Sequence, residues 1–165
     1  MTTYDVSVRP ALPADAESVW QILAPTIRSG ETTALAPDMT RDDALAFWFS
    51  PGHEVFVAEQ AGAMVGTYFL RANQTGGGAH VATCTYVVSP SATGRGIAQL
   101  MCEHSLERAR ARGFLAMQFN FELSSNERRV KLWERAGFRI VGRLPEAFRH
   151  PSLGLIDALV MYRAL

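Results

Sequence analysis

The sequence has few cysteines and no excess of charge of either sign. Among its 165 residues are two cysteines, Cys84 and Cys102, while 16 basic residues balance 16 acidic ones. Two cysteines exclude a disulfide framework, and neither has Cys or His neighbours at metal-ligand spacing, so we expect buried free thiols and no metal site. The balanced charge excludes a whole-molecule field that would draw the protein onto nucleic acid or an anionic membrane, and no nucleic-acid partner is expected.

Long hydrophobic runs are absent as well. No stretch approaches the length of a membrane span, and the N-terminus has no apolar secretory run. We therefore expect a cytoplasmic protein without a membrane partner. Hydrophobic residues make up 48% of the chain and charged residues 19%, which is typical of a globular protein, and the length predicts a single domain over residues 1–165.

Hydrophobic periodicity predicts strands and helices in the order β-α-α-β-β-β-α-β-α-β-β. Strands are expected at residues 4–9, 54–59, 64–72, 80–88, 114–121, 138–143 and 156–162. Helices are expected after Pro13, over 40–48, over 97–112, and from the capping box at residues 124–127 to Gly137. The central strand-turn-helix-strand unit should cross over with a right hand, so its two strands are expected to be parallel. The fold class is therefore α/β, a mixed sheet of about seven strands flanked by helices.

Local signals predict two helix starts and one loop. Thr40 followed by Asp43, and Ser124 followed by Glu127, match the capping box that begins a helix. Residues 144–153 include two prolines and are expected to form a loop between the last two strands.

A glycine-containing turn separates the strand at 80–88 from the helix at 97–112. It reads Thr93-Gly94-Arg95-Gly96-Ile97-Ala98. Glycines let the backbone approach a ligand closely, and the free N–H groups and dipole of a helix N-terminus favour a phosphate or pyrophosphate. The turn lacks the Lys-Ser/Thr ending of a P-loop and the glycine spacing of a dinucleotide fingerprint, which excludes both of those nucleotide sites. A plain tight turn is the alternative.

The turn and its surroundings resemble the GCN5-related N-acetyltransferase superfamily. In that family a hydrophobic-Val-x-Pro-like segment precedes Gln/Arg-x-x-Gly-x-Gly/Ala, and Asn-x-x-Ala-x-x-Leu-Tyr-x-x-x-Gly-Phe follows further along the chain. Here Val87-Val88-Ser89-Pro90 precedes the glycine turn. The matching residues of the second motif are Asn126, Leu132, Trp133, Gly137 and Phe138. The resemblance covers nearly the whole chain and is strongest over residues 80–138.

The resemblance implies that acetyl-coenzyme A (acetyl-CoA) donates an acetyl group to an amine, and it implies roles for the residues around the turn. The backbone of residues 86–88 would pair with the pantetheine arm like an added strand, the turn amides would hold the pyrophosphate, and Asn126 would contact the arm. Arg95 either adds charge there or faces solvent. The implied coenzyme-binding residues are Tyr86, Val87, Val88, Thr93, Gly94, Arg95, Gly96, Ile97, Ala98, Asn126 and Trp133.

Two positions depart from the family pattern. Thr93 stands where the family has Gln or Arg, which costs little because backbone amides hold most of the phosphate. Trp133 stands where the family often has Tyr as the general acid for the departing thiolate. An indole N–H cannot give up a proton near neutral pH, so proton donation from position 133 is excluded. Packing or a contact with the thioester are the two roles left for Trp133.

Direct transfer requires that the attacking amine lose a proton. An amine with a pKa of about 10 is mostly protonated at pH 7, so a base is needed. The catalytic candidates are Glu122, Asn120 and His80, with Glu59 a weaker choice as base. Glu122 and Asn120 lie two residues apart on one strand and are expected to share a face. Asn120 lies among aromatic residues, so its amide should be paired, either with the acceptor or within the protein.

Acceptor specificity in this superfamily comes from the loop between the first two helices and the segment before the last strand. The first loop resembles that of phosphinothricin-type acetyltransferases, and residues 142–163 resemble the branch that acetylates proline analogues. The substrate-binding candidates are Glu31, Thr32, Asn120 and Arg149. Arg149 either binds a carboxylate in a bidentate way or is a solvent-exposed loop arginine. We therefore expect a small amine or imine that carries a carboxylate.

Two other functions are compatible with the same motifs. A protein or peptide N-acetyltransferase would need an open groove across the sheet, and a non-catalytic acyl-CoA-binding module would need no acid at position 133. A homodimer is also expected, because Trp48, Phe49 and residues of the last strand are apolar and expected to be exposed.

Overall fold

Seven strands form one mixed sheet in the computed structural model, which describes residues 5–165. The strand order is β1-β2-β3-β4-β5-β7-β6, and every neighbouring pair is antiparallel except β4 and β5. The strands are β1 (Val6–Pro10), β2 (Glu54–Gln60), β3 (Ala63–Ala72), β4 (Val81–Val88), β5 (Ala116–Leu123), β6 (Arg139–His150) and β7 (Gly154–Ala164). The predicted mixed α/β sheet with a parallel central pair is confirmed. Tyr4, predicted to begin the first strand, lies outside the described residues.

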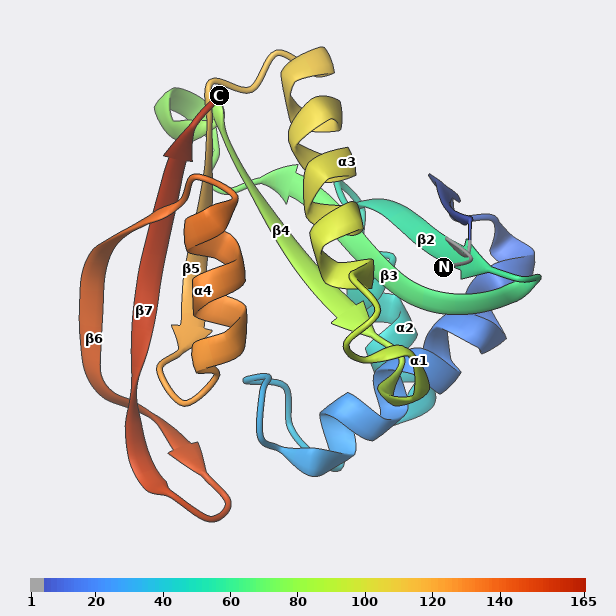
Figure 1. The fold of residues 1–165 in the computed structure, drawn as a ribbon, viewed down its shortest axis with the longest axis horizontal. Coiled ribbons are helices and arrows are strands. Elements are labelled where there is room, and N and C mark those ends of the chain that lie inside the picture. Colours follow the sequence, from blue (N-terminus) through green and yellow to red (C-terminus); the bar gives the residue numbers. More distant parts are fainter. Residues whose placement is uncertain (1–4) are drawn as a thin grey trace.

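Helices cover both faces of the sheet (Figure 1). The α-helices are α1 (Ala16–Ser29), α2 (Arg41–Trp48), α3 (Ile97–Ala111) and α4 (Glu127–Arg135), and short 3-10 turns lie at Pro13–Asp15, Gly76–Gly78 and Pro90–Ala92. One apolar cluster joins α1 and α2 to the sheet, and a larger one joins α3 and α4 to the other face. No helix within residues 5–165 is both long and apolar enough to cross a membrane.

The helix ends follow local sequence in two cases and not in a third. The Thr40 hydroxyl accepts a hydrogen bond of 3.1 Å from the Asp43 amide, which confirms the predicted start of α2. Gly137 has a φ of 92° and ends α4 in a Schellman motif, with the Phe138 amide bonded to the Trp133 carbonyl at 3.0 Å. The cap predicted at Ser124 is wrong: the Ser124 amide is still bonded to β7 through the Asp157 carbonyl, so α4 begins only after Asn126.

The loop predicted at residues 144–153 is wrong. β6 runs to His150 and β7 begins at Gly154, so a long hairpin replaces the loop and only residues 151–153 form its tip. Pro145 falls where the pairing of β6 with β7 is interrupted, between Leu144 and Phe148. A bulge on an edge strand tolerates proline because no ladder hydrogen bond is required of its nitrogen. Pro145 therefore marks an irregularity within β6, and only Pro151 lies just beyond the end of that strand.

β4 and β5 separate soon after they begin. Their parallel pairing comprises only Val81 with Ala116 and Ala82 with Met117, and the strands then diverge (Figure 1). Further along β5 the pairing with β7 shifts between Phe119 and Glu122, so this end of β5 bends. Within residues 5–165, the edge of β4 beyond Ala82 has no strand partner on that side.

The apolar residues thought to support self-association differ in exposure. Trp48 is only 1% exposed, and its indole N–H donates to the Thr67 hydroxyl at 3.1 Å, so the expectation that it is exposed is wrong. Phe49 is 36% exposed. The homodimer stays a prediction. Cys84 and Cys102 are buried free thiols, as predicted.

Candidate functional site

Two pockets meet where β4 and β5 separate. The first, here called the α3 pocket, has a volume of about 440 Å³ and opens at the N-terminus of α3 between residues 92–99 and α4. The second, the sheet pocket, has a volume of about 280 Å³ and lies between residues 83–87 of β4, 119–123 of β5 and the segment 32–35 after α1. The residues that line both pockets are Thr26, Thr32, Val87, Asn126 and Arg129.

The α3 pocket contains a ready-made anion site. Gly94 and Gly96 have φ angles of 84° and 79°, a left-handed conformation that other residues adopt only with strain. The amides of Gly94, Arg95 and Gly96 donate no backbone hydrogen bond within residues 5–165, and Gly96 provides no side-chain cap for α3. Free amides at the start of a long helix favour a phosphate group.

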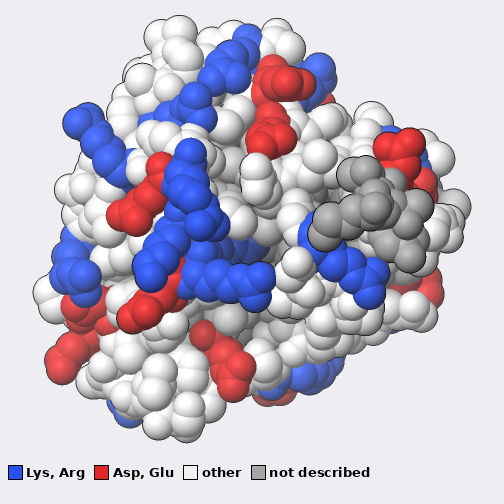
Figure 2. Space-filling view, in the orientation of Figure 1, with Lys and Arg blue, Asp and Glu red and all other residues white. Residues whose placement is uncertain are grey.

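Basic side chains from α4 reinforce this site. Arg128 and Arg135 line the α3 pocket, and a Cβ placed on Gly94 would lie 3.4 Å from Nη2 of Arg128. Figure 2 shows Lys and Arg side chains gathered over α4. Amides and guanidinium groups that converge in this way suit the pyrophosphate of a coenzyme.

Most of the coenzyme-binding residues implied by the resemblance line the α3 pocket. They are Val87, Val88, Thr93, Gly94, Gly96, Ile97, Ala98 and Asn126. Arg95 does not line it, because its side chain is exposed and Nη1 donates to the Gln60 Oε1 at 3.2 Å. Trp133 does not line it either, since it is fully buried against the rings of Tyr86 and Phe119 at centroid distances of 5.1 and 5.0 Å.

The sheet pocket is lined by the free edge of β4. Five consecutive residues, 83–87, contact it, although alternate residues of a strand face opposite sides of a sheet. The strand therefore presents its main chain, with N–H and C=O groups that β5 no longer pairs. Tyr86 contributes in this way, because its hydroxyl group is bonded elsewhere, to Ser105 Oγ at 2.6 Å.

Glu122 is the carboxylate of the sheet pocket. Removal from water raises the pKa of Glu122 above its usual value, and Arg129 and the Trp133 indole N–H lower it only in part. The Trp133 N–H is itself buried without a hydrogen-bond partner among the residues that the structure describes, so its approach to Glu122 falls short of a hydrogen bond. A half-buried carboxyl group with a raised pKa holds a proton more strongly than an ordinary one, which suits a general base.

Asn120 also lines the sheet pocket, and its amide is paired within the protein. Its Nδ2 donates to Asn73 Oδ1 at 2.6 Å, and its Oδ1 accepts from Gln118 Nε2 at 2.9 Å. Of the two explanations left open for this amide, pairing within the protein accounts for the contacts observed.

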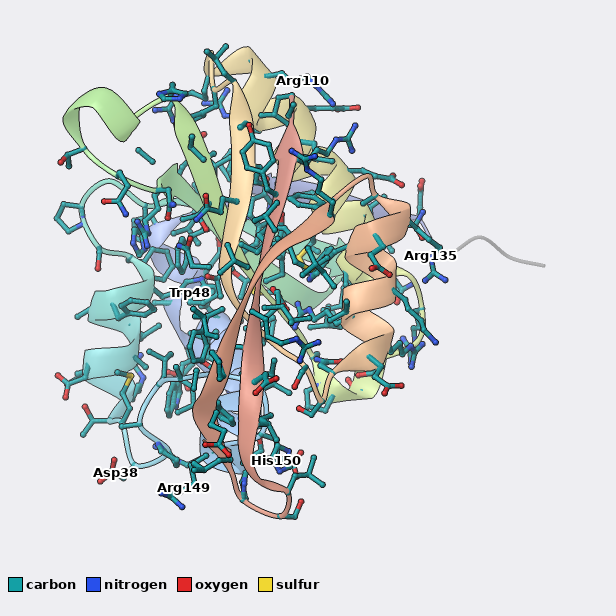
Figure 3. The ribbon with its side chains drawn as sticks, turned by 90° about the vertical axis from the view of Figure 1, so that its left-hand side faces the viewer. Asp38, Trp48, Arg110, Arg135, Arg149 and His150 are labelled. Carbon is teal, nitrogen blue, oxygen red and sulfur yellow. The ribbon has the colours of Figure 1, made fainter. Side chains whose placement is uncertain are left out.

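Several candidates do not reach either pocket. His80 is exposed in the turn before β4, Glu31 is exposed after α1, and Glu59 is bonded to Arg9 at 2.7 Å. Arg149 is exposed beside His150 near the end of the β6–β7 hairpin (Figure 3). Thr32, by contrast, lines both pockets.

Two arginines of the site were missed by sequence reasoning. Arg129 donates from Nη2 to the Tyr86 carbonyl at 2.7 Å and lines both pockets. The sequence did contain a sign of Arg129, because this arginine stands where the family motif Asn-x-x-Ala-x-x-Leu-Tyr has Ala. Arg71 lines the sheet pocket from the end of β3, and its Nη1 donates to the Ala72 carbonyl at 3.0 Å. No motif in the sequence pointed to Arg71.

The family model described as the acetyltransferase (GNAT) family matches residues 16–138. The chain belongs to this family. The matched span includes the glycine turn, the free edge of β4 and α4, and hence nearly all of both pockets. The chain is therefore an acetyl-CoA-dependent N-acetyltransferase, and the α3 pocket, with its free amides and arginines, fits the coenzyme.

Similar proteins agree with this assignment. An N-acetyltransferase (aca1) of Schizosaccharomyces pombe is 26% identical over 151 residues, which cover 81% of this chain and 72% of that protein. A GCN5-related N-acetyltransferase from Kribbella flavida is 36% identical, with a TM-score of 0.93 over 97% of this chain and 98% of the other. A Salmonella typhimurium protein solved with its cofactor acetyl-CoA shares the fold, with a TM-score of 0.84 at 20% identity over 98% and 94% of the two chains.

Within residues 5–165, no cluster of three or more His, Cys, Asp or Glu side chains is arranged to hold a metal ion.

Proposed function

We propose that this enzyme transfers the acetyl group of acetyl-CoA to the amine of a small molecule, an amino acid or an analogue, by direct attack in a ternary complex. One observation supports this most strongly: an anion-binding pocket and a smaller pocket with a half-buried carboxyl group meet at shared residues. Bound acetyl-CoA supplies the acetyl group as a thioester. The amides of residues 94–98 with Arg128 and Arg135 hold its pyrophosphate, and Val87, Val88 and Asn126 contact its arm.

Glu122 acts as the general base. An amine with a pKa of about 10 must lose a proton before it attacks, and a carboxylate whose pKa is raised above its usual value accepts that proton more readily than an ordinary one. The cysteines do not compete as nucleophiles, because burial raises the pKa of Cys84 and of Cys102 to about 12. Transfer without an acyl-cysteine intermediate follows.

The acceptor is small and carries a carboxylate. The sheet pocket has a volume of about 280 Å³, and residues 32–35 bound it on one side, which disfavours a long peptide. Arg71 and Glu122 line the same pocket from β3 and β5. The guanidinium group of Arg71 can bind the carboxylate of an amino acid, and the carboxylate of Glu122 can bind its amine, so the two side chains match the two ends of an amino acid. Arg71 takes the role that the sequence suggested for Arg149.

The release of free thiol from acetyl-CoA across a panel of amines tests this proposal. The panel contains amino acids and cyclic imino acids, the same compounds without the carboxylate, and short peptides. Arg71→Ala should raise the KM for carboxylated acceptors and leave that for decarboxylated ones unchanged. Arg149→Ala is the matched control and should change neither. Turnover of peptides alone would favour a protein acetyltransferase, and coenzyme binding without turnover on any amine would favour a non-catalytic module.

A further inference from the structure

Two positions of α4, one turn apart, differ together from the family motif. Arg129 stands in place of Ala, and Trp133 in place of Tyr. Residues four apart on a helix share a face, and the Arg129 guanidinium lies over the Trp133 ring, with Cζ 5.4 Å from the ring centroid. The chain has therefore lost a phenol that could donate a proton and has gained a permanent cation beside it.

The cation has no counterion among the residues described. Arg129 is half-buried and forms no ion pair with any residue of the range 5–165. The hydrogen bond that it makes there, to the Tyr86 carbonyl at 2.7 Å, is to a neutral group on the free edge of β4. Glu122 lies near enough to interact with this charge but forms no ion pair with it, so the half-buried cation is further stabilised when an anion arrives beside it.

The position of Arg129 identifies the anion. The donor enters from the α3 pocket and the acceptor from the sheet pocket, so they meet at the residues that line both, and Arg129 is the one charged residue among these five. We infer that Arg129 is a catalytic residue that stabilises the departing coenzyme A thiolate by its charge, where the family motif would supply a proton from Tyr. This inference rests on the proposed acetyl transfer.

The step balances with the groups at the site. Glu122 first takes the proton of the ammonium group and releases it to water. The lone pair of the neutral amine nitrogen then forms a bond to the thioester carbonyl carbon, and the second proton of that nitrogen passes to Glu122. The C–S bond breaks, its electron pair stays on sulfur, and the thiolate takes a proton from water on release. A guanidinium group keeps its positive charge in proteins, so Arg129 acts as a fixed charge placed where negative charge develops.

The other charged groups at the site favour this role. They are Glu122 on β5, Arg71 on β3, and Arg128 and Arg135 on α4. Glu122 is neutralised when it accepts the proton of the amine, so the carboxylate no longer competes for Arg129 when the thiolate forms. Arg71, Arg128 and Arg135 each line only one pocket.

A spectroscopic titration of bound coenzyme A tests the inference without turnover. The ultraviolet absorbance of the thiolate is followed against pH at saturating coenzyme A and without acceptor. In the natural protein the pKa of the bound thiol should lie about one to three pH units below its ordinary value of about 8.5. The protein's own thiols do not interfere, because the pKa of Cys84 and of Cys102 is raised to about 12.

Three variants separate charge from packing. Arg129→Met keeps the apolar stem and should return the thiol pKa to its ordinary value, whereas Arg129→Lys should retain part of the decrease. Arg128→Ala is the matched control: it should weaken coenzyme A binding and leave the thiol pKa at the natural value. Equal thiol pKa values in the natural protein and Arg129→Met would overturn the inference. So would an Arg129→Met variant that only raises the KM of the acceptor. Failure of coenzyme A to bind the natural protein would instead refute the proposed function.

Discussion

The α3 pocket and the sheet pocket are built in opposite ways. The α3 pocket takes its anion site from consecutive residues, 93–98, whose backbone conformation follows from two glycines and the start of a helix. The sheet pocket takes its side chains from β3, β4, β5 and the segment after α1, which meet only because β4 and β5 separate. A donor site made of main chain can be recognised in a short motif, whereas an acceptor site made of distant side chains cannot.

The largest effect should come from the side chain that makes the sheet pocket reactive. Glu122→Gln should lower kcat by about 100-fold or more, because a positioned general base contributes that much, and should leave the dissociation constant of acetyl-CoA unchanged. In the natural enzyme kcat/KM should rise with pH as Glu122 ionises, above the usual range of a carboxyl group, and the variant should lack this dependence.

Steady-state kinetics over a range of pH and a binding titration check this prediction. Glu134→Gln, an exposed change on α4, is the control and should behave as the natural enzyme. A Glu122→Gln variant with the natural kcat would remove Glu122 from the reaction and with it the contrast between the two pockets.

The next effect should come from the main chain of the α3 pocket. Gly96 and Gly113 both have left-handed φ angles, 79° and 85°, and a Cβ would meet nothing within 4 Å at either. Alanine at either position should cost about 1–2 kcal/mol of folding free energy. Only Gly96→Ala should also weaken acetyl-CoA binding, by about tenfold, since it disturbs amides that face the coenzyme. Isothermal titration of both variants with acetyl-CoA measures this difference. Equal acetyl-CoA affinities of the two variants would mean that the pyrophosphate binds elsewhere.

A smaller effect concerns stability. The raised pKa of Glu122 means that the folded protein binds its proton more tightly than the unfolded chain does. That contribution to stability is fully present at acidic pH and is lost as the pH rises through the folded pKa. Glu122→Gln should therefore have a higher Tm than the natural protein at neutral pH, with the difference shrinking in acid. Calorimetry at several pH values measures it, and an unchanged Tm at neutral pH would mean that burial does not penalise the charge.

The smallest effect should come from a hydrogen bond under the sheet pocket. Trp48→Phe removes the N–H that bonds to Thr67 and should cost about 1 kcal/mol, or somewhat more with the lost packing, in the free energy of unfolding. Thr67 keeps its other bond, to the Phe56 carbonyl at 2.8 Å. Urea denaturation should reveal the loss while acetyl-CoA affinity stays unchanged. A loss of coenzyme affinity would show that the two pockets are coupled through the core.

The same contrast, between features made by neighbouring residues and features made by distant ones, explains what the sequence could predict. The element order, the parallel central pair and the Gly137 helix end follow from patterns within a few residues, and these predictions are confirmed. The loop at 144–153 and the cap at Ser124 failed because strand pairing with β7 overrode local turn signals. Trp48 was expected at the surface, although packing against α1 and the sheet buries it. Arg71 reaches the sheet pocket only through tertiary structure.

The structure of the complex with acetyl-CoA tests the central claim most directly, since that claim is that donor and acceptor meet between the two pockets. The pyrophosphate should lie on the amides of residues 94–98, and the thioester should lie at the junction lined by Arg129, within reach of Glu122. An acetyl group held outside that junction, or a pyrophosphate bound away from the glycine turn, would contradict the account.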